Sequence, residues 1–253
     1  MKSDTHASVT RSLTSPLRNL VPATVLLLAL ICLALPSLQA QDQPSGADET
    51  RGKPTFKIST IGEWKNKALF YRSPTKGSDK KEAKKLELLD MGYSPSYVFK
   101  RGTPIQLLQE TGNTEKPYRT ALQINVPETI RQPLILLIQL KGKLTFRLFD
   151  LNPKKFPFGS IQSVNFSSHE LQVALNKKIV TLKPSNKHIF PAIKEAKKQG
   201  WLRVATKKNN KLVFSSMMMR RAKKRILIFF INGKNGEAVE TRMLVDFKPA
   251  PAG

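Results

Sequence analysis

The chain has 253 residues, with 40% hydrophobic content, 13 Gly, 17 Pro and a single Cys. This composition is ordinary for a globular protein and excludes both a fully disordered chain and a collagen-like fibre. The charge is unusual, because 43 Lys and Arg residues oppose only 18 Asp and Glu residues and the formal net charge is +25. An excess of this size favours partners that carry negative charge.

The first forty residues have the pattern of a secretory signal. A basic segment precedes an almost wholly apolar run from Leu20 to Leu35, and Ala40 offers a small residue for cleavage. The apolar run has 16 residues, fewer than the ~20 that a spanning helix needs. We therefore expect residues 1–40 to be a signal peptide, and the product to be secreted or periplasmic with no transmembrane span. An uncleaved membrane anchor is the alternative.

The only cysteine, Cys32, lies inside this segment. If cleavage follows Ala40, the exported product has no thiol, which excludes disulfides and thiolate chemistry and leaves core burial as the source of stability. Residues 41–54 are polar, contain Pro and Gly and show no periodicity, so they predict a flexible leader.

From residue 55 onward the pattern predicts an all-β protein. Short apolar or alternating segments are separated by Gly, Pro and Asn at short intervals, which is typical of sandwiches and barrels. The first predicted strands are 55–61, 67–72, 85–90, 96–100, 104–109, 119–126 and 133–140. The others are 143–150, 160–166, 170–175, 178–183, 187–190, 201–206, 211–216, 225–232 and 239–247. We expect one or two immunoglobulin-like antiparallel β-sandwiches, with halves at 55–142 and 143–248.

Three local patterns add detail to this prediction. The runs from Leu134 to Ile138 and from Ile226 to Ile231 are apolar at every position, as expected for central strands covered on both faces. Asn176-Lys177 fits a two-residue hairpin turn. Residues 191–199 predict one short helix, because Pro191 suits a first helical turn and Gly200 can end the helix.

The positive charge is concentrated in the second half. Between Leu171 and Gly236 there are 17 basic residues and one acidic residue, Glu195. Five basic residues fall in the six positions from Arg220 to Arg225, and such a run repels itself unless it is solvated or neutralised by a partner. A solvated loop in a Lys-rich protein is the alternative. We predict a polyanion-binding patch, on the supposition that cations from separate hairpins gather on one face. The candidate residues are Lys207, Lys208, Lys211, Arg220, Arg221, Lys223, Lys224 and Arg225.

The chain beyond the signal offers little for catalysis. Its two histidines, His169 and His188, lack the spacing of a zinc motif, and no Gly-rich phosphate-binding loop occurs. We therefore expect no catalytic residue, no metal site and no cofactor. The alternative is a secreted hydrolase that acts on envelope or extracellular polymers through carboxylates brought together by folding.

The pattern F-P-x-G-S at 156–160, followed by N-x-S at 165–167 and L-x-P at 182–184, resembles a group of secreted bacterial β-sandwich proteins. The likeness extends loosely over most of the chain beyond the signal. It implies a β-sandwich architecture and an exported location. It implies no activity, since proteins of that group have none assigned.

We therefore expect an exported, non-enzymatic, envelope-associated structural or binding component. Its partner would be an anionic envelope surface or polysaccharide, held by charge attraction that salt screens within about 8–10 Å. We do not expect nucleic-acid binding, because the aromatic residues near the charge, Trp201 and Phe214, occupy positions typical of a core. A further alternative is an accessory subunit that pairs an apolar edge strand with another envelope protein.

Overall fold

The structure is a computed structural model that describes residues 52–62, 64, 68–73, 83–140, 143–233 and 238–249. The predicted signal peptide and most of the predicted leader lie outside the described residues. The described part is all-β, and it contains no helix.

Sixteen strands follow one another along the described part of the chain. The first eight are β1 (Thr55–Ile61), β2 (Phe70–Arg72), β3 (Ala83–Lys85), β4 (Tyr97–Val98), β5 (Ile105–Glu110), β6 (Tyr118–Ile124), β7 (Pro133–Leu140) and β8 (Lys143–Asp150). The second eight are β9 (Ile161–Asn165), β10 (Leu171–Leu175), β11 (Lys178–Leu182), β12 (Lys187–Phe190), β13 (Lys197–Thr206), β14 (Leu212–Arg221), β15 (Lys224–Asn232) and β16 (Val239–Phe247). A strand is found at or close to each predicted position.

The second eight strands repeat the connectivity of the first eight. The first half has sheets β4-β1-β7-β8 and β3-β2-β5-β6, and the second half has sheets β12-β9-β15-β16 and β11-β10-β13-β14. Adding eight to each strand number of the first half gives the second half. Each half also contains one parallel strand pair in the same place, β1 with β7 and β9 with β15. The part of the chain that the structure describes therefore consists of two copies of one eight-stranded arrangement.

These sheets are consistent with β-sandwiches, but an immunoglobulin-like connectivity is not shown. An immunoglobulin constant domain groups its first, second, fifth and fourth strands in one sheet. Here the second, third, fifth and sixth strands of each half form one sheet, and the first, fourth, seventh and eighth form the other.

The two halves divide later in the chain than the sequence suggests. Strands β7 and β8 pair from Pro133 with Asp150 to Leu140 with Lys143, so β8 belongs to the first half. A boundary between residues 142 and 143 would cut this hairpin. The change from one half to the other occurs at residues 151–160, which we call the linker.

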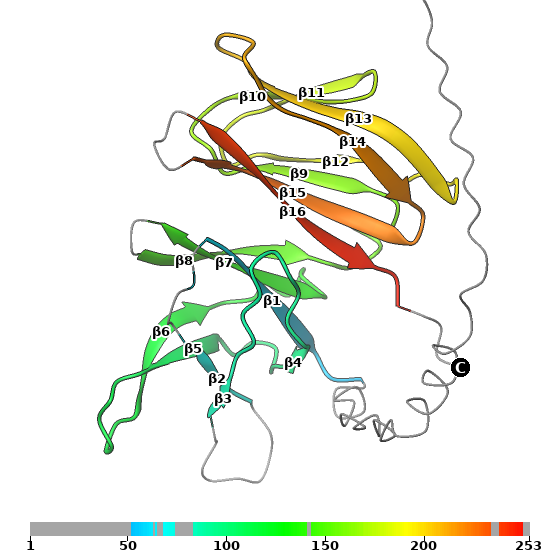
Figure 1. Cartoon of the computed structure of the whole chain (residues 1–253). Coiled ribbons are helices and arrows are strands. Elements are labelled where there is room, and N and C mark those ends of the chain that lie inside the picture. The colour runs from blue at the N-terminus through cyan, green and yellow to red at the C-terminus, as the bar shows by residue number, and fades with distance from the viewer. Residues whose placement is uncertain are drawn as a thin grey trace, which may run out of the picture. The chain divides into compact units, whose positions relative to one another are not determined.

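The four sheets are stacked (Figure 1). The inner two are β4-β1-β7-β8 and β12-β9-β15-β16, and they pack face to face. In the middle core, Leu134, Leu136 and Ile138 of β7 pack with Leu227 and Phe229 of β15. All five side chains are buried. This core joins the two halves. The two runs that are apolar at every position supply these five residues, and other strands and the linker add Ile61, Phe149, Leu151, Phe156, Val164 and Leu244.

The alternate residues of the same two strands enter the cores within each half. Ile135 and Leu137 of β7 belong to the core of the first half. Ile226, Ile228 and Phe230 of β15 belong to the core of the second half. The prediction that these central strands are covered on both faces is confirmed.

The predicted helix at 191–199 is wrong. Residues 191–196 have no regular structure, and strand β13 begins at Lys197. The segment has only Ile193 as a large apolar side chain, so a helix here would have no apolar stripe to bury. Gly200 lies inside β13, where a Cβ atom would meet the side chain of Asn176 at 3.0 Å. The glycine therefore allows a close approach rather than ending a helix.

We predict that replacing Leu136 with alanine destabilises the protein by about 2–5 kcal/mol, because Leu136 is fully buried between the inner sheets and a cavity would remain. Ile179→Ala on an outer strand, where 66% of the side chain is exposed, should change the free energy of unfolding by less than about 0.5 kcal/mol. Urea unfolding followed by circular dichroism measures both. Equal effects of the two substitutions would contradict the stacked arrangement.

Candidate functional site

The predicted polyanion-binding residues do not form one patch. One group lies at the turn between β13 and β14: Lys207, Lys208 and Lys211. Another lies at the turn between β14 and β15: Arg221, Lys223 and Lys224. Strand β14 has 10 residues. Because a strand rises about 3.3 Å per residue, the two turns are roughly 30 Å apart, at opposite ends of one strand (Figure 1).

Arg225 is buried, with only 3% of its surface exposed. Its Nε donates to Asp246 Oδ2 over 2.8 Å, and its Nη2 lies 2.6 Å from the same oxygen. Its Nη1 donates to the carbonyl oxygens of Leu151 and Phe156 over 2.6 and 2.7 Å. The guanidinium also lies 4.4 Å from the ring centre of Phe158. Arg225 therefore fastens the linker to β15 and is not exposed to an outside anion.

Arg220 is buried in a similar way. Its Nη2 donates to the carbonyl oxygens of Gly159, over 2.8 Å, and Pro191. Burial lowers the pKa of the Arg220 guanidinium, against the opposing charge of Glu195, but an arginine with two carbonyl acceptors stays protonated at neutral pH. Because successive strand residues point to opposite faces, Arg220 points inward and Arg221 outward. Two of the eight predicted residues thus hold the linker.

Cations do converge where β13 begins and where β14 and β16 end. Lys197 and Arg221 are register partners, and such partners have Cα atoms about 4.5–5.5 Å apart. Lys248 donates its backbone N–H to the carbonyl oxygen of Lys223 over 2.8 Å, which brings the segment after β16 to the turn between β14 and β15. We call this group the cationic end, and it comprises Lys197, Lys198, Arg221, Lys223, Lys224 and Lys248.

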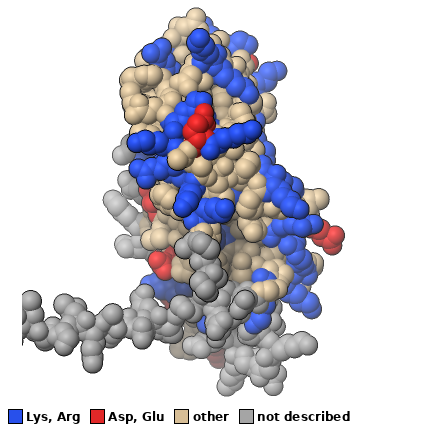
Figure 2. Space-filling view, turned by 90° about the vertical axis from the view of Figure 1, so that its right-hand side faces the viewer, with Lys and Arg blue, Asp and Glu red and all other residues tan. Residues whose placement is uncertain are grey.

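The cationic end keeps most of its charge free for a partner. Five of its six side chains are exposed and Lys224 is half-buried. Glu195 makes an exposed ion pair of 3.1 Å with Lys198, and hydrogen bonds from its own N–H and from Lys198 lower its pKa. The Asp246 carboxylate is bound by Arg225. Figure 2 faces this side of the protein and shows Lys and Arg spread over it, with Asp and Glu sparse among them.

The turn between β13 and β14 carries less uncompensated charge. Lys207 Nζ lies 3.3 Å from Glu170 Oε1, which neutralises part of its charge. Lys208 and Lys211 are exposed. This turn therefore offers a smaller net charge than the cationic end.

Sequence reasoning missed half of the cationic end. Lys197 and Lys198 fall in the segment predicted as a helix, and Lys248 follows the last strand, 23 residues beyond Arg225. Only the register between β13 and β14 brings the first two to Arg221. The two lysines before Gly200 are visible in the sequence, but the sequence does not show which residues lie beside them in the fold.

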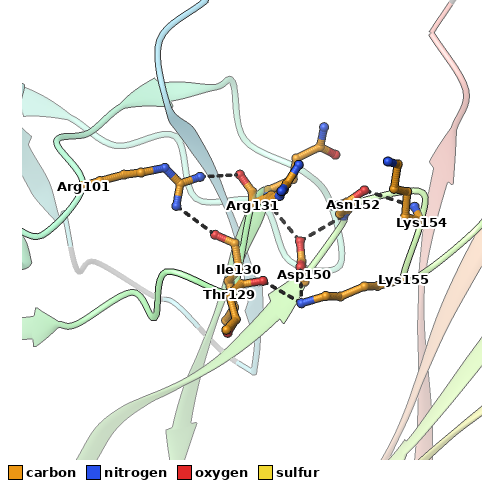
Figure 3. A network of polar contacts seen from close by, with 9 residues as sticks. Arg101, Thr129, Ile130, Arg131, Asp150, Asn152, Lys154 and Lys155 are labelled. Atoms are coloured by element: carbon orange, nitrogen blue, oxygen red, sulfur yellow. Dashed lines mark hydrogen bonds and ion pairs between the residues drawn. The ribbon is translucent and has the colours of Figure 1, made fainter.

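Asp150 at the end of β8 and Lys155 of the linker form a polar network with the turn before β7, as Figure 3 shows. Asp150 Oδ1 accepts from the backbone N–H groups of Gln132 and Asn152, each over 3.1 Å. Lys155 Nζ lies 3.2 Å from Asp150 Oδ2 and donates to the Thr129 carbonyl over 2.6 Å. Burial opposes ionisation of Asp150, but these hydrogen bonds outweigh it and lower the pKa of the carboxyl. The network fixes the start of the linker to the first half.

A pocket of about 330 Å³ lies beside the Arg225–Asp246 pair. It is lined by Thr55, Phe56, Lys57, Ser96, Gln132, Pro133, Leu151, Pro153, Phe158, Arg225, Asp246, Phe247 and Pro249. Asp246 is the single carboxylate of this lining, and two N–H groups of Arg225 occupy one of its oxygens. The pocket therefore brings no second carboxylate to Asp246.

His169 and His188 are half-buried in the second half. Burial, and next the charge of Lys178, lower the pKa of His188 on β12, so this side chain is neutral at neutral pH. The carbonyl oxygen of His169 accepts a hydrogen bond of 2.7 Å from Asn165, a buried residue at the end of β9. Among the described residues, no three His, Cys, Asp or Glu side chains come together as metal ligands would.

No protein-family model matches the chain, and no curated protein matches it. In the described part of the chain, no helix has the length and apolar character needed to cross a membrane.

We predict that Arg225→Met destabilises the protein by about 3–5 kcal/mol, because the Asp246 side chain, which is 14% exposed, would lose its charged partner. Arg221→Met removes the same charge from an exposed position four residues earlier and should change stability by less than about 0.5 kcal/mol. Thermal or urea unfolding of the two variants tests the difference. A stable Arg225→Met variant would contradict the structural role of the buried pair.

We also predict that Asp150 contributes to acid sensitivity. Its pKa is lowered in the folded state, so its contribution to stability is present above about pH 4 and is lost as the pH falls through the folded pKa. Asp150→Asn should therefore reduce stability at neutral pH and weaken its dependence on pH below about 4. Glu128→Gln removes an exposed carboxyl of the first half as the matched control. Urea unfolding from about pH 3 to pH 7 makes the comparison, and identical curves for wild type and Asp150→Asn would refute the prediction.

Proposed function

We propose that this protein is an exported, non-enzymatic component of the cell envelope that binds anionic surfaces or polymers through the cationic end. The contact is one of fixed-charge attraction. Lysine ammonium groups act as compact point charges that do not require a fixed ligand geometry, so they suit a polymer with repeated charges. Five of the six residues of the cationic end are lysines.

The observation that carries this proposal is the convergence of six cations at the ends of β13, β14 and β16. Like charges held this close repel one another, and an anionic partner relieves the repulsion. Arg220 and Arg225 do not add to the exposed charge, because Arg220 binds carbonyl oxygens and Arg225 binds both Asp246 and the linker. Among the described residues, Glu195 neutralises part of the charge of the cationic end through its ion pair with Lys198.

We further propose that the N-terminal segment directs export. The apolar run from Leu20 to Leu35 and the small residue Ala40 support this proposal. The absence of cysteine after Cys32 agrees with a protein that needs no thiol in an oxidising compartment. N-terminal sequencing of the protein recovered from the periplasm or medium tests it, and a product that retains residues 1–40 would contradict cleavage.

We predict that the mature protein binds heparin, as a probe of acidic polymers, with an affinity that falls steeply between about 50 and 500 mM salt. Replacing Arg221, Lys223 and Lys224 with glutamine should weaken binding and lower the slope of log K against log salt by about one for every ion pair with the polymer that the substitutions remove. Isothermal titration at several salt concentrations measures both quantities.

The matched control replaces Lys207, Lys208 and Lys211 with glutamine, which removes the same charge at the other end of β14. This variant should bind nearly as well as the wild type. Equal weakening in the two triple variants would show that only net charge matters. Heparin binding that ignores salt, or no binding at low salt, would overturn the proposed function.

A further inference from the structure

The outer sheet of the second half exposes large apolar side chains on its outer face. Trp201 of β13 and Met217 of β14 are register partners, and they are 46% and 51% exposed. Ile179, on β11 of the same sheet, is 66% exposed. The alternate residues Leu202 and Met218 are buried in the core. The sequence predicts a core-like position for Trp201, and the structure corrects this, because the β13 pleat turns its side chain outward.

Cations flank this apolar group on the same face. Along β13, Lys197, Trp201 and Arg203 are separated by even numbers of residues and share the outer face. The Arg203 guanidinium carbon lies 5.8 Å from the Trp201 ring centre. At the other side, Lys197 pairs with Arg221, and both belong to the cationic end. The apolar group is therefore continuous with the surface that carries the proposed function.

We propose that this face lies on the surface of an anionic lipid bilayer, with Trp201 and Met217 in the headgroup region. The inference rests on the proposed function and names its anionic surface as a membrane. Trp is enriched at membrane interfaces because its ring has an apolar body and a polar N–H. Lys and Arg near the surface are attracted by anionic headgroups. The combination of apolar side chains with flanking cations is that of interfacial binding.

The neighbours of the Trp201 ring favour a bilayer over a polysaccharide. Its cross-strand partner is Met217, and the next outward residue of β14 is Met219, which is half-buried. Thioether side chains are flexible and hardly form hydrogen bonds, so they suit fluid acyl chains and not sugar hydroxyl groups. Ile179 adds a further apolar side chain to the same face two strands away, where its partner Ala174 pairs in turn with Arg203.

Tryptophan fluorescence tests the inference directly. The chain has two Trp residues, and Trp64→Phe leaves Trp201 as the only reporter. With vesicles of mixed phosphatidylglycerol and phosphatidylcholine, we expect a blue shift of the Trp201 emission and quenching by brominated acyl chains. With vesicles of phosphatidylcholine alone, we expect no change.

Affinity measurements complete the test. The double variant Trp201→Gln, Met217→Gln should bind the anionic vesicles at least about fivefold more weakly, and heparin as well as the wild type does. Leu89→Gln, which changes a 39% exposed residue of the first half, is the matched control and should bind both probes normally. Circular dichroism and thermal unfolding verify that each variant is folded.

The outcomes separate this inference from the proposed function. Heparin binding without vesicle binding would overturn the membrane inference and leave the proposed function standing. Vesicle binding with unchanged Trp201 emission would show that another face contacts the bilayer and would overturn the inference. A Trp201 emission change with heparin alone would favour a polysaccharide over the bilayer and overturn the inference. Failure to bind either probe at low salt would overturn both proposals.

Discussion

The face-to-face packing of the two inner sheets is the constraint on which the rest of the structure depends. Strands β7 and β15 lie between two cores each, so neither strand has a solvent face. Their runs Leu134–Ile138 and Ile226–Ile231 are apolar throughout, because an unpaired charge in such a place costs several kcal/mol. These two strands therefore have almost no room for the large positive charge of the chain, which lies mainly on other strands and in the turns.

At the linker, charged side chains are nevertheless buried. The linker passes from one half to the other beside the middle core, and its carbonyl groups need donors that the sheets do not supply. Arg220 and Arg225 supply them from β14 and β15, while the Asp150 network holds the other end. Arg225 is tolerated at 3% exposure because Asp246, two carbonyl oxygens and an aromatic ring surround its guanidinium. Buried charge here fixes the path of the chain and is not free for binding.

Sequence patterns predict the strands well and the charged surface poorly, for a physical reason. Periodicity and turn residues are local, so the positions of most strands and the double burial of Leu134–Ile138 follow directly from them. Arg220 and Arg221 can belong to one patch only if their side chains lie on the same face of the sheet. Whether they do depends on where β14 ends. The sequence indicates an end near residue 216, which would make the whole run to Arg225 an exposed loop. Extending the strand to Arg221 places alternate arginines on opposite faces and removes the single patch. The same longer pairing makes the last three residues of the predicted helix, 197–199, the start of β13.

The repeat helps to separate what the fold requires from what is particular to the second half. The connection between β6 and β7 corresponds to the turn between β14 and β15. In the first half it contains Glu128 and Arg131, with no excess of either charge. In the second half the corresponding turn, with its flanking residues Arg221 and Lys224, carries cations only. Since both connections join the same two strands of the same arrangement, the connectivity does not require this charge. The cations of this turn are therefore an addition to a repeated scaffold, and a functional surface can be added to a scaffold in this way.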